Sequence, residues 1–251
     1  MHAYAAIAEL YAADYQDTRD DIDFLVVLAR HSPGPIVEYM SGTGRVLLPL
    51  ARAGFTVTGV DTSLEMMAVA QQQCAQEPSL KITLTHGDVR NWHSDTQFGF
   101  AIIAVNSFMH LTDVDDQLKA LHNIHRNLKP NGRLCIDVLN PDIRAIPNYS
   151  GKLTLMNRFT LPDGRSVQKF SAVTVDVSSQ LMHVTFLYDI NENGTIRRVE
   201  TSFPMRWFWR YEIEHLLARA GFEIEQIYGD YELEEFTSES EQMLIVASKK
   251  A

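Results

Sequence analysis

Residues 35–61, PIVEYMSGTGRVLLPLARAGFTVTGVD, carry the pattern that decides the fold of this chain. A short apolar run leads to Glu38, the turn at 41–44 (SGTG) bends the backbone sharply, and a helix-periodic run then ends at Gly54. A second run, rich in β-branched residues, closes on Asp61. The stretch therefore predicts a strand, a glycine turn, a helix and a second strand that ends in an acid.

The physical chemistry of such a unit is that of a nucleoside site. Glycines remove the side chains that would hold a ligand away from the backbone, and the N–H groups at the helix start face the ligand. Asp61, at the tip of the second strand, can accept hydrogen bonds from both vicinal hydroxyls of a ribose. A dinucleotide fingerprint would need a third glycine where the chain has Leu47, which argues against a nicotinamide-dependent oxidoreductase.

An acid four residues before G-T-G-R resembles motif I of the class I S-adenosylmethionine-dependent methyltransferases. The resemblance implies that Glu38 belongs to the site, that Gly42 and Gly44 lie against the amino-acid part of the cofactor, and that Asp61 holds its ribose. Met40 stands where the family commonly has a further glycine. The positions between and beside these residues that we also expect in the cofactor site are Met40, Thr43, Arg45 and Thr62.

Two later strand ends extend the resemblance. A third strand at 82–86 is followed by Gly87-Asp88-Val89, and in the family a carboxylate and a backbone N–H at this place hold the adenine. Asp88 and Val89 are therefore implied cofactor contacts. A continuous apolar strand at 98–105 then opens at Asn106, which we also expect at the cofactor because ligands of such sheets bind beyond the carboxyl ends of the strands.

The fold class predicted from the whole chain is α/β. Alternation of strands with helices predicts a Rossmann-like, seven-stranded, mostly parallel sheet with helices on both faces. L-K-P-N-G-R-L at 128–134 and A-G-F at 220–222 are further sequences typical of the family, each directly before a strand. The resemblance implies that the last strand, near 243–247, inserts antiparallel between its neighbours.

Residues 145–206 change to a period of two and predict an antiparallel β insertion after the fifth strand. The methyltransferase core would then be 1–144 together with 207–251. The apolar face of the third insert strand could roof the acceptor pocket, pack on the core or form a dimer contact. The four insert strands are expected at Leu153 to Thr160, Val167 to Asp176, Met182 to Ile190 and Thr195 to Phe203.

The N-terminal segment, residues 4–28, predicts two amphipathic helices. Tyr4, Tyr11 and Tyr15 recur at near-helical spacing. They could pack on the edge of the sheet, or Tyr11 or Tyr15 could cover the cofactor, because an aromatic face attracts a sulfonium cation.

Methyl transfer from a sulfonium is an in-line displacement, so catalysis is mostly placement, and a base is needed only when the acceptor begins protonated. His110 follows the fourth strand and is our candidate for the base and for an acceptor contact, with a surface histidine as the alternative. The chain lacks the N-P-P-Y, D-P-P-Y and Pro-Cys motifs of DNA methyltransferases. The further candidates for acceptor contacts are Asn140, Tyr149, Arg206 and Trp207.

Composition limits the partners. A formal charge of -10 weighs against nucleic acid and anionic membranes, and 251 residues suffice for one domain with an elaboration. Cys74 and Cys135 suit free thiols in a reducing compartment, and with no signal-peptide pattern or membrane-spanning run we expect a cytoplasmic protein.

The sequence thus predicts an enzyme that moves a methyl group from S-adenosyl-L-methionine to an N or O atom of a small molecule and releases S-adenosyl-L-homocysteine. A non-catalytic S-adenosylmethionine sensor or scaffold is the main alternative. We expect no metal site, and the chain could be a monomer or a homodimer.

Overall fold

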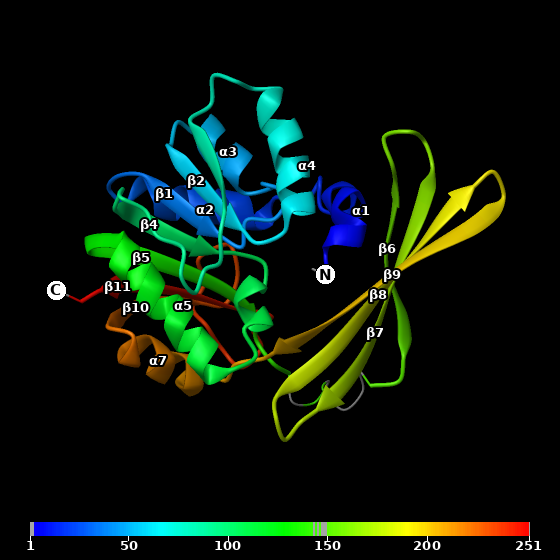
Figure 1. The fold of residues 1–251 in the computed structure, drawn as a ribbon. Coiled ribbons are helices and arrows are strands. Elements are labelled where there is room, and N and C mark those ends of the chain that lie inside the picture. The colour runs from blue at the N-terminus through cyan, green and yellow to red at the C-terminus, as the bar shows by residue number, and fades with distance from the viewer. Residues whose placement is uncertain (1–2, 143, 145, 147–149, 251) are drawn as a thin grey trace.

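The structure is a computed structural model that describes residues 3–142, 144, 146 and 150–250. Its centre is a seven-stranded sheet in the order β10-β11-β5-β4-β1-β2-β3 (Figure 1). The first five strands pair in parallel, and β11 lies antiparallel between β5 and β10. The predicted sheet and its antiparallel last strand are confirmed. The strands are β1 (Ile36–Tyr39), β2 (Val57–Asp61), β3 (Ile82–His86), β4 (Phe98–Ile103), β5 (Leu128–Leu139), β10 (Phe222–Tyr228) and β11 (Gln242–Lys249).

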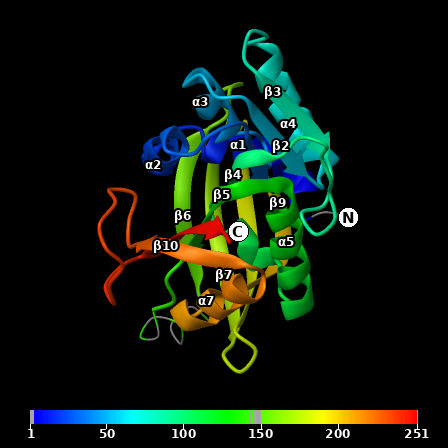
Figure 2. The same ribbon diagram turned by 90° about the vertical axis from the view of Figure 1, so that its left-hand side faces the viewer.

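Helices cover both faces of this sheet, as predicted (Figure 2). On one face, α2 (Asp20–Arg30) and α3 (Leu47–Arg52) bury leucines and Phe24 against β1 and β4. On the other, α5 (Val114–Asn127) and α7 (Arg210–Arg219) pack on β4 and β5. β4, which lies between these helices, is apolar throughout because both of its faces are buried.

The other helices among the described residues are the 3-10 turn η1 (Ala5–Ile7), α1 (Ala8–Asp14), α4 (Leu64–Ala75) and the 3-10 turn η2 (Ser107–His110). α4 connects the parallel strands β2 and β3 and contacts both. Ser63 caps α4, since its hydroxyl accepts the Met66 N–H at 3.3 Å. Asp113 directly precedes α5 and makes no side-chain capping hydrogen bond.

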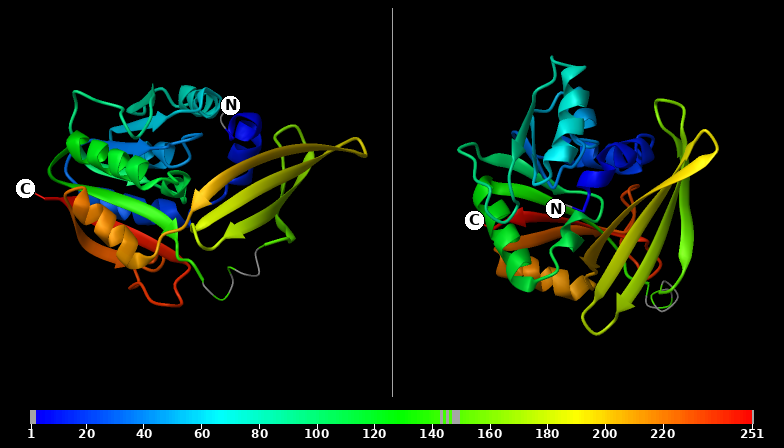
Figure 3. Two further views of the ribbon diagram at one scale, coloured as in Figure 1. Left: turned by 60° about the horizontal axis from the view of Figure 1, so that its bottom comes forward. Right: turned by 45° about the vertical axis from the view of Figure 1, so that its right-hand side comes forward.

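The insertion forms a separate four-stranded antiparallel sheet, in the order β6-β7-β8-β9. Its strands are β6 (Leu153–Thr160), β7 (Ser166–Asp176), β8 (Leu181–Glu192) and β9 (Thr195–Arg206), so all four predicted strands are present. Figure 3 shows this sheet standing beside the main sheet, with α1 next to it. No helix in the described part of the chain is long and apolar enough to cross a membrane.

The apolar face predicted for β8 is divided between two partners. Met182 and Val184 belong to the core cluster that contains α5 and α7. Tyr188 and Ile190, further along the same face, pack with Ile7 and other residues of η1 and α1. The insert therefore joins the N-terminal segment to the main domain by apolar burial, the dominant favourable term in packing.

Candidate active site

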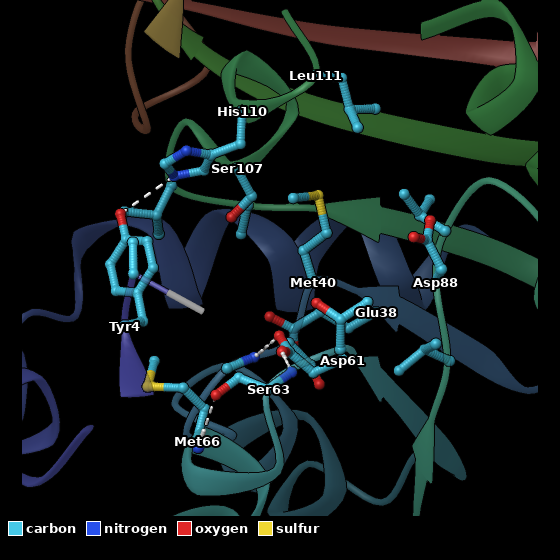
Figure 4. Close-up of a pocket in the computed structure, with 18 of the residues that line it drawn as sticks. Tyr4, Glu38, Met40, Asp61, Ser63, Met66, Asp88, Ser107, His110 and Leu111 are labelled. Carbon is cyan, nitrogen blue, oxygen red and sulfur yellow. Dashed lines mark hydrogen bonds between the residues drawn. The ribbon is translucent and has the colours of Figure 1, made fainter. Parts of the chain in front are cut away.

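A cavity of about 340 Å³ opens where β1, β2 and β4 end. The chain order of the sheet reverses between β1 and β4, which is where ligands of open α/β sheets bind. In Figure 4, Glu38 and Asp61 lie on one side of the cavity and Tyr4 and His110 on the other. The predicted site residues that line it are Tyr11, Glu38, Met40, Gly42, Thr43, Arg45, Asp61, Thr62, Asp88, Val89 and His110.

The glycine turn owes its shape to left-handed backbone. Gly42 and Gly44 have φ of 53° and 80°. A Cβ on Gly42 would come within 3.2 Å of the Met66 side chain, and one on Gly44 within 3.3 Å of the Ala70 side chain. The left-handed backbone and the close packing on α4 therefore favour glycine at both positions. Gly42 lines the cavity, whereas Gly44 lies outside its lining.

Met40 adopts the backbone conformation that a glycine would adopt at lower cost. Its φ is 57°, in the left-handed region that is strained for most residues with a side chain. In Figure 4 its side chain lies between Glu38 and Ser107, inside the cavity. The departure from the family pattern thus preserves the turn and places a thioether at the centre of the site.

Asp61 is fixed between the glycine turn and the start of α4. One carboxylate oxygen accepts the Gly42 N–H at 2.8 Å and the other accepts the Ser63 N–H at 2.7 Å. These two hydrogen bonds fix the orientation of the carboxylate, which lines the cavity.

Glu38 is buried beneath the turn, with 4% of its surface exposed. Its Oε2 has no hydrogen-bond partner among the residues that the structure describes. Burial raises its pKa to about 8, Asp21 and Asp61 add to the rise, and the positive charge of Arg45 opposes it. Glu38 is therefore a buried acid that a nearby cation would ionise.

Arg45 and Arg90 are both paired with carboxylates. The Arg45 guanidinium donates to Asp21 of α2, with one N–O distance of 2.8 Å. Arg90 donates from its backbone N–H and Nε to Asp88 at 2.8 and 2.9 Å, and also pairs with Asp116. Arg90 holds the pKa of Asp88 below its usual range, so Asp88 reaches the cavity as an anion.

The other side of the cavity is aromatic. The Tyr4 hydroxyl lies 3.1 Å from His110 Nε2, and the Tyr4 ring stacks on Phe203 of β9 with centroids 5.0 Å apart. His110 meets the same Phe203 ring edge-on at 5.1 Å. Burial lowers the pKa of His110, although a hydrogen bond to the Pro204 carbonyl raises it in part. The imidazole is thus neutral near neutral pH.

The Tyr4 hydroxyl and His110 Nε2 share one hydrogen bond, whose direction depends on which imidazole nitrogen carries the proton. The pair places two groups that can move a proton at the cavity wall.

The position of His110 depends on a strained turn after β4. Val105 and Asn106 both have positive φ, 51° and 61°. Asp137 of β5 fixes them, because its side chain accepts the Val105 N–H at 3.0 Å and its carbonyl accepts the Asn106 N–H at 3.0 Å. Strain of this kind persists only where the surroundings determine it, and here it begins η2 with its histidine.

The structure places Asn106, a predicted cofactor contact, outside the cavity lining. Its side-chain oxygen accepts the Leu139 N–H at 2.6 Å. Tyr15 also lies outside the lining and stacks on Tyr11 with centroids 4.6 Å apart. Of the two tyrosines expected to cover the cofactor, only Tyr11 faces the cavity.

Three predicted acceptor contacts lie elsewhere. Trp207 is a core residue, 1% exposed, and Arg206 is the last residue of β9, paired with Leu181. Asn140 donates its side-chain N–H to the Ser240 carbonyl at 2.8 Å. None of these three lines the cavity. The fourth candidate, Tyr149, lies outside the described residues.

Several lining residues were not predicted as site residues. The sequence marks Tyr4 only by its spacing from Tyr11 and Tyr15, and Phe203 only as the last residue of an expected strand. No local pattern marks either one, because each reaches the cavity through the docking of its segment. The other unpredicted lining residues include Ala3, Ser63, Met66, Gly87, Ser107 and Leu111.

Comparison with known proteins identifies the class of this fold and site. Residues 36–132 match the family model of a methyltransferase domain. The glycine/sarcosine N-methyltransferase of Aphanothece halophytica is 26% identical over 211 residues, which are 83% of this chain and 74% of that protein. The dTDP-3-amino-3,6-dideoxy-alpha-D-glucopyranose N,N-dimethyltransferase of Streptomyces fradiae is 25% identical over 230 residues, 89% of this chain and 86% of that one.

Among solved structures, the CcbJ methyltransferase from Streptomyces caelestis matches with a TM-score of 0.80 and 22% identity over 100% of both chains. The fold is therefore that of the Rossmann-like methyltransferases, with the insert included. The chain belongs to the class I S-adenosylmethionine-dependent methyltransferases. This membership leaves the nicotinamide-dependent alternative without support.

Proposed function

We propose that this protein transfers a methyl group from S-adenosylmethionine to an amine nitrogen of a small molecule. The observation that carries the proposal is the meeting, in one cavity, of Glu38, Asp61 and Asp88 with the half-buried pair of His110 and Tyr4. The acids suit a cationic nucleoside, and the imidazole suits an acceptor that must lose a proton.

The residues on the acidic side of the cavity, Glu38, Asp61 and Asp88, fit the cofactor. Asp61, held at the cavity wall by the Gly42 and Ser63 N–H groups, would take the ribose hydroxyls. Asp88 and Val89 would hold the adenine. Glu38, buried with one oxygen unpaired, would face the positive charge, which would lower its pKa and ionise it. S-adenosylmethionine supplies a methyl carbon made electrophilic by the positive sulfur that carries it.

The aromatic side of the cavity fits an amine acceptor. Tyr4, Tyr11 and Phe203 present aromatic rings to the cavity, and such rings stabilise the ammonium that N-methylation creates. The two relatives named above are N-methyltransferases of glycine or sarcosine and of an amino sugar. Both observations favour nitrogen over oxygen as the accepting atom.

The protein's own part in the reaction is placement and proton removal. The walls formed by Tyr4, Met40 and Phe203 would hold the nitrogen lone pair in line with the methyl carbon, and such positioning is a major source of rate enhancement. As the N–C bond forms, the C–S bond breaks and its electron pair stays on sulfur. The excess proton on nitrogen would pass to the hydrogen-bonded pair of Tyr4 and His110.

The test has two stages. Isothermal titration calorimetry with S-adenosyl-L-homocysteine examines the acidic side of the cavity and is expected to give binding that Asp61→Ala strongly weakens. Incubation with methyl-labelled S-adenosylmethionine and a panel of amino sugars and amino alcohols then examines transfer, with fragmentation mass spectrometry to locate the label on N or O. Label on oxygen alone would contradict the amine proposal, and binding without transfer to any compound would favour the sensor alternative.

A further inference from the structure

The inner face of the insert carries a buried cation. Lys169 of β7 has a side chain only 5% exposed, and its Nζ lies 2.5 Å from Oδ2 of Asp14, whose side chain is 4% exposed. The other Asp14 oxygen accepts the Asn157 side-chain N–H at 2.7 Å. A buried charge pair loses hydration that only good geometry and further hydrogen bonds offset, and this pair has both.

Aromatic rings complete the surroundings of this ammonium. Lys169 Nζ lies 4.3 Å from the ring centroid of Phe186, 4.9 Å from that of Tyr15 and 5.7 Å from that of Tyr188. Two of these rings belong to the insert, and Tyr15 directly follows α1. Because ring faces attract cations most strongly when water is excluded, Lys169 is held from both segments at once.

The same contacts lead to the cavity without entering it. Tyr15 stacks on Tyr11, and Phe186 meets Phe203 edge-on at 5.2 Å, while Tyr11 and Phe203 line the cavity. Lys169 itself is not in the lining. One ring, Tyr15, therefore lies between Lys169 and the lining residue Tyr11, and one ring, Phe186, lies between Lys169 and the lining residue Phe203.

A second attachment lies at the start of the N-terminal segment. The Thr201 hydroxyl of β9 donates to the Ala3 carbonyl, and the Tyr4 ring stacks on Phe203. Residues 3–15 are thus fastened to the insert near both of their ends, by β9 at one end and by β7 at the other. Tyr4 and Tyr11, the cavity residues of this segment, lie between the two attachments.

We propose that Lys169 is a positioning residue that fastens residues 3–15 to the insert, so that both close the cavity as one unit. The proposal rests on the proposed function, since it takes the cavity to be the cofactor site. It implies that cofactor affinity depends on a residue of the insert that does not touch the cofactor. If the attachment is lost, Tyr15 no longer supports Tyr11 over the cavity.

The test replaces Lys169 with methionine, which has a similar length and no charge. Lys169→Met is expected to weaken S-adenosyl-L-homocysteine binding by about tenfold, within the usual range of coupling between sites. Calorimetry measures the affinity at a temperature well below the melting temperature of the variant. Hydrogen–deuterium exchange of residues 3–15 in the bound protein should also rise.

Arg198→Met is the matched control in the same sheet. Arg198 pairs with Asp189 at 2.6 Å, as Lys169 pairs with Asp14, but its side chain is half exposed. This variant should retain the wild-type affinity and the wild-type exchange of residues 3–15. Asp14→Asn, which removes the charge from the other partner, should reproduce the loss and decides the matter if Lys169→Met does not fold.

The outcomes separate the two proposals. A folded Lys169→Met protein with a lowered melting temperature and unchanged affinity would show a purely structural role and overturn the inference. The same holds for Asp14→Asn. If the wild-type protein itself does not bind S-adenosyl-L-homocysteine, it is the proposed function that fails.

Discussion

The two halves of the cavity are assembled in different ways. The half with Glu38, Asp61 and Asp88 comes from consecutive strand ends, β1 to β3, within one continuous part of the chain. The half with Tyr4, His110 and Phe203 comes from three segments that are remote in sequence. The first half follows from local chain geometry, whereas the second exists only when the insert and the N-terminal segment have docked.

The two halves also differ in their chemistry. Charged groups dominate the first, and its two guanidinium groups, Arg45 and Arg90, are both engaged by carboxylates. Neutral rings and a neutral imidazole form the second. This contrast supports our proposal that the acids serve the cofactor while the insert and the N-terminal segment shape the acceptor side. Substitutions in each half should therefore affect different steps.

The largest effect is expected from Asp61→Ala. Loss of two charge-assisted hydrogen bonds to the ribose should weaken S-adenosyl-L-homocysteine binding by about 1,000-fold. Calorimetry by displacement measures this loss. Asp95→Asn, on a fully exposed side chain, is the control and should bind as the wild type does. A loss below tenfold for Asp61→Ala would contradict its role in the first half.

His110→Ala should separate the halves. Removal of the base should lower the rate of methyl transfer by about 100-fold. The affinity for S-adenosyl-L-homocysteine should stay close to that of the wild type, because His110 belongs to the acceptor side. Single-turnover assays and calorimetry give the two quantities. His93→Ala, at an exposed histidine, serves as control, and an equal rate loss in both variants would refute the assignment.

Glu38→Gln examines the link between charge and binding. The pKa of Glu38 is raised to about 8 in the protein. A cation beside it lowers that pKa, so binding of S-adenosylmethionine should release a proton and strengthen as pH rises toward 8, by at most about tenfold per pH unit. Calorimetry in buffers of different ionisation enthalpy counts the protons. Glu38→Gln should lose this part of the pH dependence.

The same group gives a prediction for the free protein. Because its folded pKa lies above its unfolded value, Glu38 contributes stability that is fully present below its ordinary pKa of 4.5 and is lost as pH rises through about 8. The free energy of unfolding of the wild type should therefore fall over this interval more than that of Glu38→Gln. Glu200→Gln, at an exposed position, should follow the wild type.

The smallest effect is expected from Trp207→Phe. Loss of buried volume should lower the free energy of unfolding by about 1 kcal/mol, a modest value because the substitution also removes an indole N–H that has no partner among the described residues. Urea unfolding measures it, with the more exposed Trp209→Phe as control. Unchanged stability together with a raised KM for the acceptor would restore the acceptor contact first expected for Trp207.

Much of the first half could be predicted from the sequence. The glycine turn can be read locally, because left-handed backbone and close packing on α4 leave few residue types at Gly42 and Gly44. Asp61 could be placed because a strand that ends in an acid after such a turn points its carboxylate at the turn. In the structure the Asp61 carboxylate accepts a hydrogen bond from the Gly42 N–H at 2.8 Å.

Some side chains predicted as ligand contacts near strand ends serve the fold in the structure. The amides of Asn106 and Asn140 hydrogen-bond the backbone at Leu139 and Ser240. Proximity in sequence to a site does not fix the direction of a side chain, because backbone groups at a sharp turn compete for the same polar atoms. The core position of Trp207 could not be predicted, because burial of an aromatic residue depends on the packing of distant elements.

The sequence by itself determined the seven-stranded sheet, the four insert strands and the acids of the cofactor half, since periodicity, turn chemistry and strand ends are local properties. Only the tertiary structure decided that Tyr4, His110 and Phe203 meet, and that Lys169 pairs with Asp14 beneath Tyr15. The physical reason is that these contacts join residues far apart in the chain. They form when two sheets and an N-terminal helix bury apolar surface against one another, and no short pattern of residues encodes that docking.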